Sequence, residues 1–533
     1  MRRDRMKKFV IFILVIFLVS CVSTEEDVTS KQVLNFMLPS EPSELDPNLI
    51  SETYAAAIIT NTYEGLVLLA EDGSVAPGAA ESWKVNDDNS EFTFYLRQNA
   101  KWSDGSPVTA EDFKDSFIRV LEESETNGAL LAGYVRNGIE YFEGNYDLEV
   151  GIEVVNTYEL KITTYAPTPF FLEVLTYSGF VPVPLSIRNG QDSSWITNKG
   201  LAISNGPYMV ADYKKDEYLT VEKNPHYWDA ENIKLDQIKF LFRANDTDIM
   251  AMYTNDEIDG IYEITASELR MIPNSEIDTY SNVLASTAYL TFNHDSDIFS
   301  NKDMRELLSI AIDREGVVAE ALLGAGIVTE YFVPFQYNVE KESFRDYTEL
   351  GSGQELEKAK KLLQSAVDSG TYDGRPIKWY YMLNGPDTDT TEYMIKQLER
   401  DLELSFELYQ LPWAELYEVA VGGDYDILTI GWSADYPHPM TFLSTFGSNG
   451  IISKITRWYD PTYDDMIDDF FSGDFEGSIL DHMKSMEIMI LEDHHIAPVY
   501  YRKGLSLIDR NLKGWYRNTS SMFNFTRAYF EDN

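Results

Sequence analysis

The stretch Gly431-Trp-Ser-Ala-Asp-Tyr-Pro-His-Pro-Met-Thr-Phe-Leu443 decides the fold of this chain of 533 residues. It follows the run Asp424-Tyr-Asp-Ile-Leu-Thr-Ile430, whose length and apolar content are typical of a buried β-strand. The strand leads into a glycine, and glycine permits another group to approach the backbone closely. We therefore expect a buried strand that ends at an approachable backbone.

Strand-like and helix-like patterns alternate on both sides of this stretch. The segment 92–97 alternates, with Phe92, Phe94 and Leu96 on one face, which predicts a strand. Thr109 is a plausible helix N-cap, with Asp112 where a capping box uses Glu or Gln. Apolar spacing predicts further helices over 303–311 and 355–367. With no repeat and no linker, these patterns indicate interleaved α/β lobes, and the length indicates more than one domain.

The N-terminus has the features of an export signal. A basic start precedes the apolar run Phe9–Val19, whose eleven residues are fewer than the roughly 20 that span a bilayer. Leu18-Val-Ser-Cys21 is typical of a bacterial lipobox, and Cys21 is the only cysteine, so we expect lipidation there. An ordinary signal beside an incidental thiol is the alternative. We expect residues 1–20 to be a signal peptide and 21–30 to be a lipid-anchored tether.

Composition limits the possible partners. The formal charge is −45, and residues 1–20 carry five basic groups and one acid, so the remainder is more acidic still. Such a surface repels phosphate backbones, so we expect no nucleic-acid partner. One cysteine also excludes a disulfide framework, and the core must supply the stability.

No catalytic or metal motif is present in the sequence. It has no Gly-x-Ser-x-Gly elbow, no phosphate loop and no Cys-x-x-Cys. His494 and His495 are adjacent, so in a strand they would point to opposite faces and could not share a metal. Together with Glu492-Asp493 they fit a polar turn before the strand 496–500 better than a metal cluster. We therefore expect no enzyme activity, no cofactor and no bound metal.

Seven stretches in a fixed order resemble the peptide and nickel family of ABC-importer binding proteins, the extracellular solute-binding family 5. The resemblance is strongest to its oligopeptide-binding branch and extends over nearly the whole chain after the signal. The stretches are Ala79-Ala-Glu-Ser-Trp83 with Arg97-Gln-Asn-Ala-Lys-Trp-Ser-Asp-Gly-Ser-Pro-Val-Thr-Ala-Glu-Asp-Phe113, Ser204-Asn-Gly-Pro-Tyr208, Glu222-Lys-Asn-Pro-His-Tyr-Trp228, Glu257-Ile-Asp-Gly260, Phe292-Asn293 with 304–314, Gly431–Leu443, and Ala497-Pro-Val-Tyr-Tyr501.

The resemblance implies an α/β fold: a two-lobed periplasmic-binding-protein clamp (type II, cluster C) with an extra α/β domain. Lobe I is expected over 31–54, 180–285 and 501–533. The extra domain is expected over 55–179 and lobe II over 286–500. Trp102 and Phe113 are then expected to pack in the scaffold.

A receptor for many peptides can read only the ligand's backbone and charged ends. Backbone reading adds the ligand as a strand to an open edge. By resemblance, Gly431-Trp432-Ser433 form that edge, and the segment around Glu41 pairs from the other side. The resemblance also implies that Asp435 binds the ligand's α-ammonium. A turn or N-cap role is the alternative for Asp435.

Further positions follow from the same resemblance. Trp413 and Trp432 are expected to line side-chain pockets, with a core role as the alternative. Asn384 is expected near the ligand, with a simple turn as the alternative. Ser433 replaces a cysteine that forms a disulfide in Gram-negative members. Those members also hold the ligand's carboxylate with basic residues, whereas 413–431 contains no Lys, Arg or His.

The sequence therefore predicts an extracytoplasmic oligopeptide-binding lipoprotein that delivers short peptides to an ABC importer. Its expected partners are short peptides and the importer's permease subunits, with the membrane reached only through the lipid anchor. We expect a monomer, in the periplasm or on the cell surface. The alternatives are a non-peptide ligand, such as a nickel chelate or a sugar oligomer, and a peptide-sensing or adhesion lipoprotein without transport.

Overall fold

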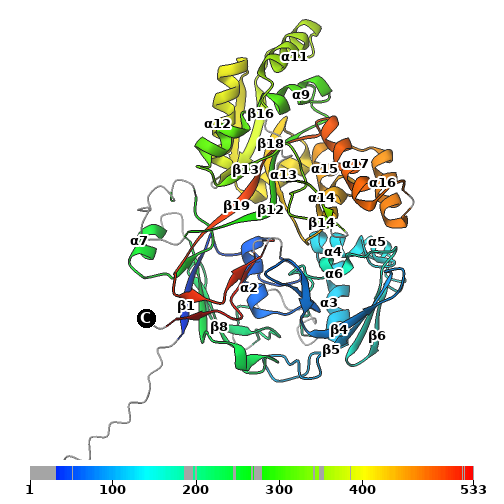
Figure 1. Ribbon diagram of the computed structural model, residues 1–533, viewed down its shortest axis with the longest axis vertical. Helices are drawn as coiled ribbons and strands as arrows, with labels where there is room; N and C mark the ends of the chain where they lie inside the picture. The colour runs from blue at the N-terminus through cyan, green and yellow to red at the C-terminus, as the bar shows by residue number, and fades with distance from the viewer. Residues whose placement is uncertain are drawn as a thin grey trace, which may run out of the picture. The chain divides into compact units, whose positions relative to one another are not determined.

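One mixed β-sheet runs through most of the computed structural model (Figure 1). Its strand order is β17-β16-β18-β12-β19-β11-β1-β10-β9-β8, and β13 also pairs with β19. The strands are β1 (Val33–Leu38), β8 (Tyr208–Lys214), β9 (Tyr218–Lys223), β10 (Gln237–Phe242), β11 (Gly260–Ile261), β12 (Thr279–Phe292), β13 (Gly326–Val328), β16 (Ile377–Met382), β17 (Phe406–Leu411), β18 (Ile427–Ser433) and β19 (Ile496–Ile508).

The structure describes residues 32–50, 52–184, 196–198, 201–243, 248–265, 268, 279–339, 342–346, 353–383, 386–473, 475–518, 520 and 522–531. The expected signal peptide and tether, Cys21 included, lie outside these residues, as does Asn384. Residues 33–533 form a compact unit by themselves. In the part of the chain that the structure describes, no helix is both long enough and apolar enough to cross a membrane.

The two longest strands, β12 and β19, pair antiparallel in the middle of this sheet. Their register shifts between Val283 and Thr287 and again between Ala288 and Tyr289. A β-bulge bends a strand and increases its twist. The first shift coincides with the expected crossing at 285–286, and Tyr501 pairs with Thr287 just beyond it. The division into lobes stays a prediction. The first register shift marks the place in β12 where a bulge would bend the strand.

Helices cover the β16 and β17 end of the sheet (Figure 1). Two of them confirm the helices predicted over 303–311 and 355–367. Asn301 caps one by accepting a hydrogen bond from the Met304 backbone N–H. Gly370 ends another in the left-handed conformation, at φ 73°. The elements are α9 (Lys302–Ala311), α10 (Arg314–Gly316), η3 (Val317–Ala321), α11 (Leu356–Ser369), α12 (Pro386–Leu402), α13 (Trp413–Gly422), α14 (Met440–Leu443), η5 (Ser444–Phe446), α15 (Ile451–Thr456), α16 (Pro461–Ser472) and α17 (Ile479–Glu492).

A second, four-stranded sheet lies within the range expected for the extra domain, in the order β4-β5-β7-β6. Asp112 completes the capping box despite being one carbon shorter than Glu: its carboxylate accepts from the Thr109 N–H at 2.7 Å. As expected, Trp102 and Phe113 are buried. The elements are α2 (Thr53–Thr62), β2 (Val67–Leu69), β3 (Val75–Pro77), β4 (Ala80–Val85), β5 (Glu91–Leu96), α3 (Ala110–Glu123), α4 (Glu125–Ala132), α5 (Gly138–Phe142), β6 (Ile152–Asn156), β7 (Glu159–Thr163) and α6 (Phe171–Val174).

Short elements complete the described chain. They are η2 (Ala230–Asn232), α7 (Ile249–Thr254) and three two-stranded ribbons. The ribbons are β14 (Asn338–Val339) with β15 (Glu342–Ser343), β20 (Leu512–Lys513) with β23 (Tyr529–Phe530), and β21 (Tyr516–Arg517) with β22 (Phe523–Asn524).

A buried ion pair joins the segment after β1 to helix α3. The Arg119 guanidinium donates to both carboxylate oxygens of Asp46, at 2.8 and 2.7 Å. The Asp46 side chain is 1% exposed and that of Arg119 is 9% exposed. Arg119 also pairs with Glu123 one turn along the helix, but the Glu123 side chain is 46% exposed.

We predict that Asp46→Asn lowers the free energy of unfolding by about 3–5 kcal/mol, because it leaves a buried guanidinium without its main counter-charge. Glu123→Gln is the matched control, and its expected cost is at most about 1 kcal/mol because the pair is exposed. Urea unfolding followed by circular dichroism measures both. Equal losses in the two variants would contradict the assignment of Asp46–Arg119 as the stabilising pair.

Candidate functional site

Three parallel strands end at one edge of the main sheet. β16 pairs in parallel with β17 on one side and with β18 on the other. In open α/β sheets, ligands bind beyond the carboxyl ends of such strands. Trp413 follows β17 and Asp435 follows β18, so two of the predicted site residues lie at this edge. Asn384 follows β16 along the chain, but it lies outside the described residues.

The end of β18 has an open side. β16 pairs with β18 only over Ile427–Thr429. Within the described chain, Ile430–Ser433 pair only with β12 on the opposite side. Backbone donors and acceptors on the open side of this segment are therefore available to another strand. The predicted edge Gly431-Trp432-Ser433 lies within it.

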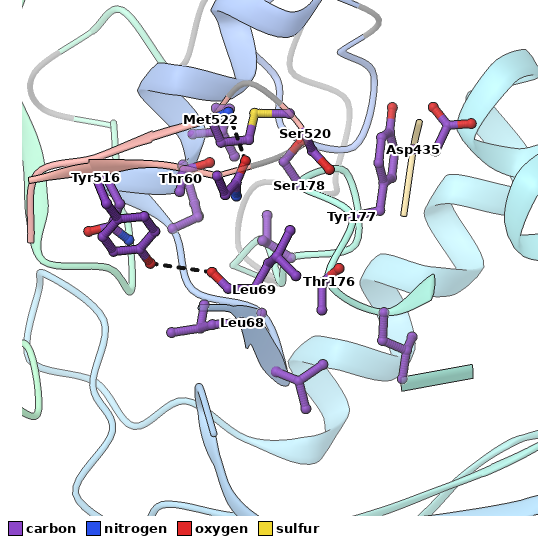
Figure 2. Close-up of a pocket in the computed structure, with 18 residues that line it drawn as sticks. Thr60, Leu68, Leu69, Thr176, Tyr177, Ser178, Asp435, Tyr516, Ser520 and Met522 are labelled. Atoms are coloured by element: carbon purple, nitrogen blue, oxygen red, sulfur yellow. Dashed lines mark hydrogen bonds between the residues drawn. The ribbon is translucent and has the colours of Figure 1, made fainter. Parts of the chain in front are cut away.

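Asp435 lines a cavity with residues that are distant in the sequence (Figure 2). Figure 2 shows its carboxylate beside the Tyr177 ring, with Ser178, Thr60 and Met522 further along the wall. Among the described residues, the lining contains no Lys, Arg or His, and Asp435 forms no ion pair. Burial raises the pKa of Asp435 to about 7, and the Thr441 side chain opposes this shift through a hydrogen bond. The site thus contains a carboxylate for which no described residue supplies a cation.

Two hydrogen bonds to Thr441 hold the loop that carries Asp435. The Asp435 backbone N–H donates to the Thr441 hydroxyl at 3.0 Å. The Trp432 indole N–H donates to the Thr441 carbonyl at 2.8 Å. Trp432 is partly buried and packs against the main core, so it shapes the loop as well as lying on the predicted edge. The Ser433 hydroxyl bonds that of Ser286 across the strand pair, at 2.9 Å.

The other predicted residues are placed differently. Trp413 is 51% exposed at the start of α13, with its ring 6.0 Å from that of Tyr417. The Glu41 carboxylate already accepts hydrogen bonds from the Tyr213 hydroxyl and the Asp216 N–H. What the segment around Glu41 can offer a ligand is therefore its backbone, as the sequence analysis proposed.

Aromatic contacts join the loop after Asp435 to the α4–α6 region. The hydroxyls of Tyr134 and Tyr436 are hydrogen-bonded. Phe170 stacks on His438 with centroids 4.0 Å apart and planes 3° apart. These contacts pack the residues next to Asp435 against that region. They could not be predicted from the sequence, because they depend on side chains far apart in the chain: the two tyrosines are separated by 302 residues.

Two groupings of polar side chains were not predicted from the sequence. Arg502 lies against Gly431: a Cβ at this glycine would be 2.5 Å from the arginine Nη2. His495 lies in the turn before β19, not in a strand, and its ring bonds that of His294 at 3.3 Å. Among the described residues, no group of three or more His, Cys, Asp or Glu is arranged to hold a metal.

Comparison with known families agrees with this geometry. Residues 74–454, most of the chain, match the bacterial extracellular solute-binding proteins, family 5 Middle. The chain belongs to this family. Its members are substrate-binding proteins that act outside the cytoplasm.

Two relatives in Bacillus subtilis match nearly the whole chain. The dipeptide-binding protein DppE is 25% identical over 497 residues, covering 92% of this chain and 90% of the relative. The oligopeptide-binding protein OppA is 25% identical over 519 residues, covering 95% and 94%. A solved periplasmic oligopeptide-binding protein from Borrelia burgdorferi superposes with a TM-score of 0.82 at 28% identity, covering 94% of this chain and 100% of the other.

Two structures of the murein tripeptide-binding protein MppA, each 26% identical to this chain, allow a comparison of conformations. One, from Escherichia coli, gives a TM-score of 0.82 and covers 95% of this chain and 99% of the other. The unliganded open form gives 0.70 and covers 94% and 98%. The arrangement in residues 33–533 is therefore less like that open form, in keeping with the contacts of Tyr134 and Phe170.

We predict that Thr441→Val raises the pKa of Asp435 above about 7, because the variant removes the hydroxyl that lowers it. A carboxyl carbon-13 titration by NMR measures this pKa, with Asp435→Asn identifying the resonance. Thr445→Val is the control, since its hydroxyl bonds the Phe442 carbonyl instead. An unchanged or lower pKa in Thr441→Val would contradict the role of this hydroxyl.

Proposed function

We propose that this protein captures short peptides outside the cytoplasmic membrane and delivers them to an ABC importer. The observation that carries the proposal is the Asp435 carboxylate, which faces a cavity and has no cationic partner among the described residues. Burying a carboxylate without a partner is costly, so such a group is seldom kept for stability alone. A ligand ammonium supplies the missing charge.

The open side of β18 provides the second part of peptide recognition. A peptide that lies beside Ile430–Ser433 continues the sheet where β16 stops, and it satisfies the unpaired backbone groups there. Asp435 follows this segment directly, so an extended ligand can pair with the strand while its amine meets the carboxylate. Backbone pairing is independent of side chains and suits a receptor for many peptides.

The relatives support the same ligand class. Proteins named as dipeptide-binding and oligopeptide-binding match nearly the full length of this chain. The described residues that line the cavity show no arrangement of a nucleophile, base and oxyanion site, and Asp435 is the only charged one among them. We infer a binding protein without enzyme activity. A non-peptide ligand is a weaker proposal, because a ligand without an amine would leave the Asp435 carboxylate without a partner.

The remaining parts of the proposal rest on the sequence. The lobes are assigned to 31–54, 180–285 and 501–533, and to 286–500, with the extra domain at 55–179. The lipobox supports an anchor at Cys21, which tethers a monomer to a bacterial membrane outside the cytoplasm, in the periplasm or on the cell surface. The acidic surface supports the absence of a nucleic-acid partner.

We predict that Asp435→Asn weakens the binding of a tripeptide at least about 100-fold, because the ligand ammonium loses its counter-charge in a buried site. Isothermal titration calorimetry measures the affinity. The ligand-free variant should be as stable as the wild type, since it loses a buried charge that has no described cationic partner. Asp424→Asn is the charge-matched control: Asp424 is exposed and pairs with Lys378 near the start of β18.

The N-acetylated form of the same tripeptide tests the ligand's side of this contact. Acetylation removes the ammonium, and the wild-type affinity should fall to about that of Asp435→Asn. Equal affinity for free and acetylated peptides would show that the amine is not recognised. Absence of binding to any free peptide would contradict the proposed function as a whole.

We also predict that tripeptide affinity falls as the pH is lowered below about 7. The ammonium pairs with the ionised form of Asp435, whereas in the ligand-free protein this carboxyl takes up a proton below its raised pKa of about 7. The fall approaches tenfold per pH unit, and it should disappear in Asp435→Asn. Calorimetry between pH 5 and 8 measures it. A flat profile in the wild type would contradict the raised pKa.

A further inference from the structure

Four aromatic side chains meet where the chain between α4 and α6 contacts the loop after Asp435. The Tyr134 hydroxyl is hydrogen-bonded to that of Tyr436, and the two rings meet edge to face with centroids 6.0 Å apart. The Phe170 ring stacks on His438 at 4.0 Å and lies nearly parallel to Tyr436 at 6.1 Å. We call these four residues the aromatic latch.

The two sides of the latch come from different parts of the proposed clamp. One side lies in the range 55–179, assigned to the extra domain, and the other in the range 286–500, assigned to lobe II. Each of the four side chains is at most 9% exposed. Separation of the two sides would return their faces to water, and burial of aromatic surface is favourable. The contact therefore favours the closed arrangement.

The latch is separate from the ligand cavity. None of its four residues is among the described residues that line the cavity beside Asp435. Pairing of a peptide with Ile430–Ser433 does not involve them either. The contacts of the latch are thus complete in the protein without a ligand, and they stabilise the closed arrangement equally with and without one.

His438 is held in position for this contact by its own loop. Its Nδ1 accepts a hydrogen bond from the Met440 backbone N–H at 3.3 Å, and its backbone N–H donates to the Tyr436 carbonyl at 2.8 Å. Burial lowers the pKa of His438 to about 3, so the ring is neutral at neutral pH. A neutral ring can stack on Phe170 without the cost of desolvating a charge.

Two arrangements of this fold are known among the relatives. The two structures of MppA have the same identity to this chain, but the TM-score is 0.82 for one and 0.70 for the unliganded open form. Opening of the clamp between the extra domain and lobe II would break the latch, because its two sides lie on these two parts.

We propose that the aromatic latch keeps this protein closed in the absence of a ligand, so that a ligand enters only during brief openings. The inference goes beyond the proposed function, because the closed state needs no peptide. Its consequence for peptides rests on the proposed function: a weaker latch should speed both entry and release. The affinity should change little, because the latch stabilises the empty and the filled closed forms alike.

A distance measurement by electron paramagnetic resonance on the ligand-free protein tests the latch itself. Val155→Cys and Ile488→Cys, both at exposed positions, carry spin labels in a Cys21→Ser background, since Cys21 is the only native cysteine. Refolding removes any bound ligand, and a pH of about 8 keeps His438 neutral in either arrangement. The labelled parent should give a single distance, and His438→Ala should add a second one.

Matched variants separate the latch from a general loss of structure. His438→Phe keeps a ring that stacks on Phe170 and should keep the single distance, as should His226→Ala, which changes an exposed histidine outside the latch. Phe170→Leu removes the stack from the other side and should also add the second distance, with circular dichroism confirming that each variant folds. Two distances in the ligand-free parent, or a single distance in both His438→Ala and Phe170→Leu, would overturn the inference.

Stopped-flow fluorescence with a tripeptide measures the effect on exchange. His438→Ala should raise the association and dissociation rate constants at least about threefold, because one stacked pair is lost, while the affinity stays within about threefold of the parent's. A lower affinity without faster association would show that the latch forms only around a ligand, which would also overturn the inference. If no peptide binds, the proposed function fails, and the distance measurement still tests the latch.

Discussion

The site depends on one constraint: a partly buried carboxylate lies at the end of β18 with no described cation to neutralise it. Burial raises the pKa of Asp435 to about 7, and no other charged residue lines the cavity beside it in the part of the chain that the structure describes. Two residues hold the loop around Asp435 in place. Thr441 accepts hydrogen bonds from the Asp435 backbone and the Trp432 indole, and the Tyr134 hydroxyl bonds that of Tyr436. Such a site is completed by a ligand that carries an ammonium group.

The rest of the fold places this carboxylate next to the open side of β18, where another strand can pair. β16 stops pairing at Thr429, while β12 continues to support β18 as far as Ser433. The bulged strand β12 and its partner β19 connect this edge to the other half of the main sheet. Arg502 lies on β19 beside the bulge. The pairing of β12 with β19 therefore also brings a cation close to Gly431 of β18.

Local sequence patterns predicted much of the fold. The Thr109 cap was predicted from a residue type whose effect is confined to one helical turn. The start of β18 was less well predicted: the predicted strand begins at Asp424, but the strand begins three residues later, at Ile427. Asp424 itself is exposed and pairs with Lys378. Arg502 escaped notice because its contact with Gly431 depends on the order of three strands. Asp435 was found through a family motif, and neither spacing nor periodicity identified it.

A crystal structure of the protein with a bound tripeptide tests the central claim most directly. The account predicts that the peptide's ammonium lies within hydrogen-bonding distance of the Asp435 carboxylate, and that its backbone pairs with Ile430–Ser433. A closed complex in which Asp435 points away from the ligand, or in which the cleft holds a metal chelate or a sugar, would contradict it.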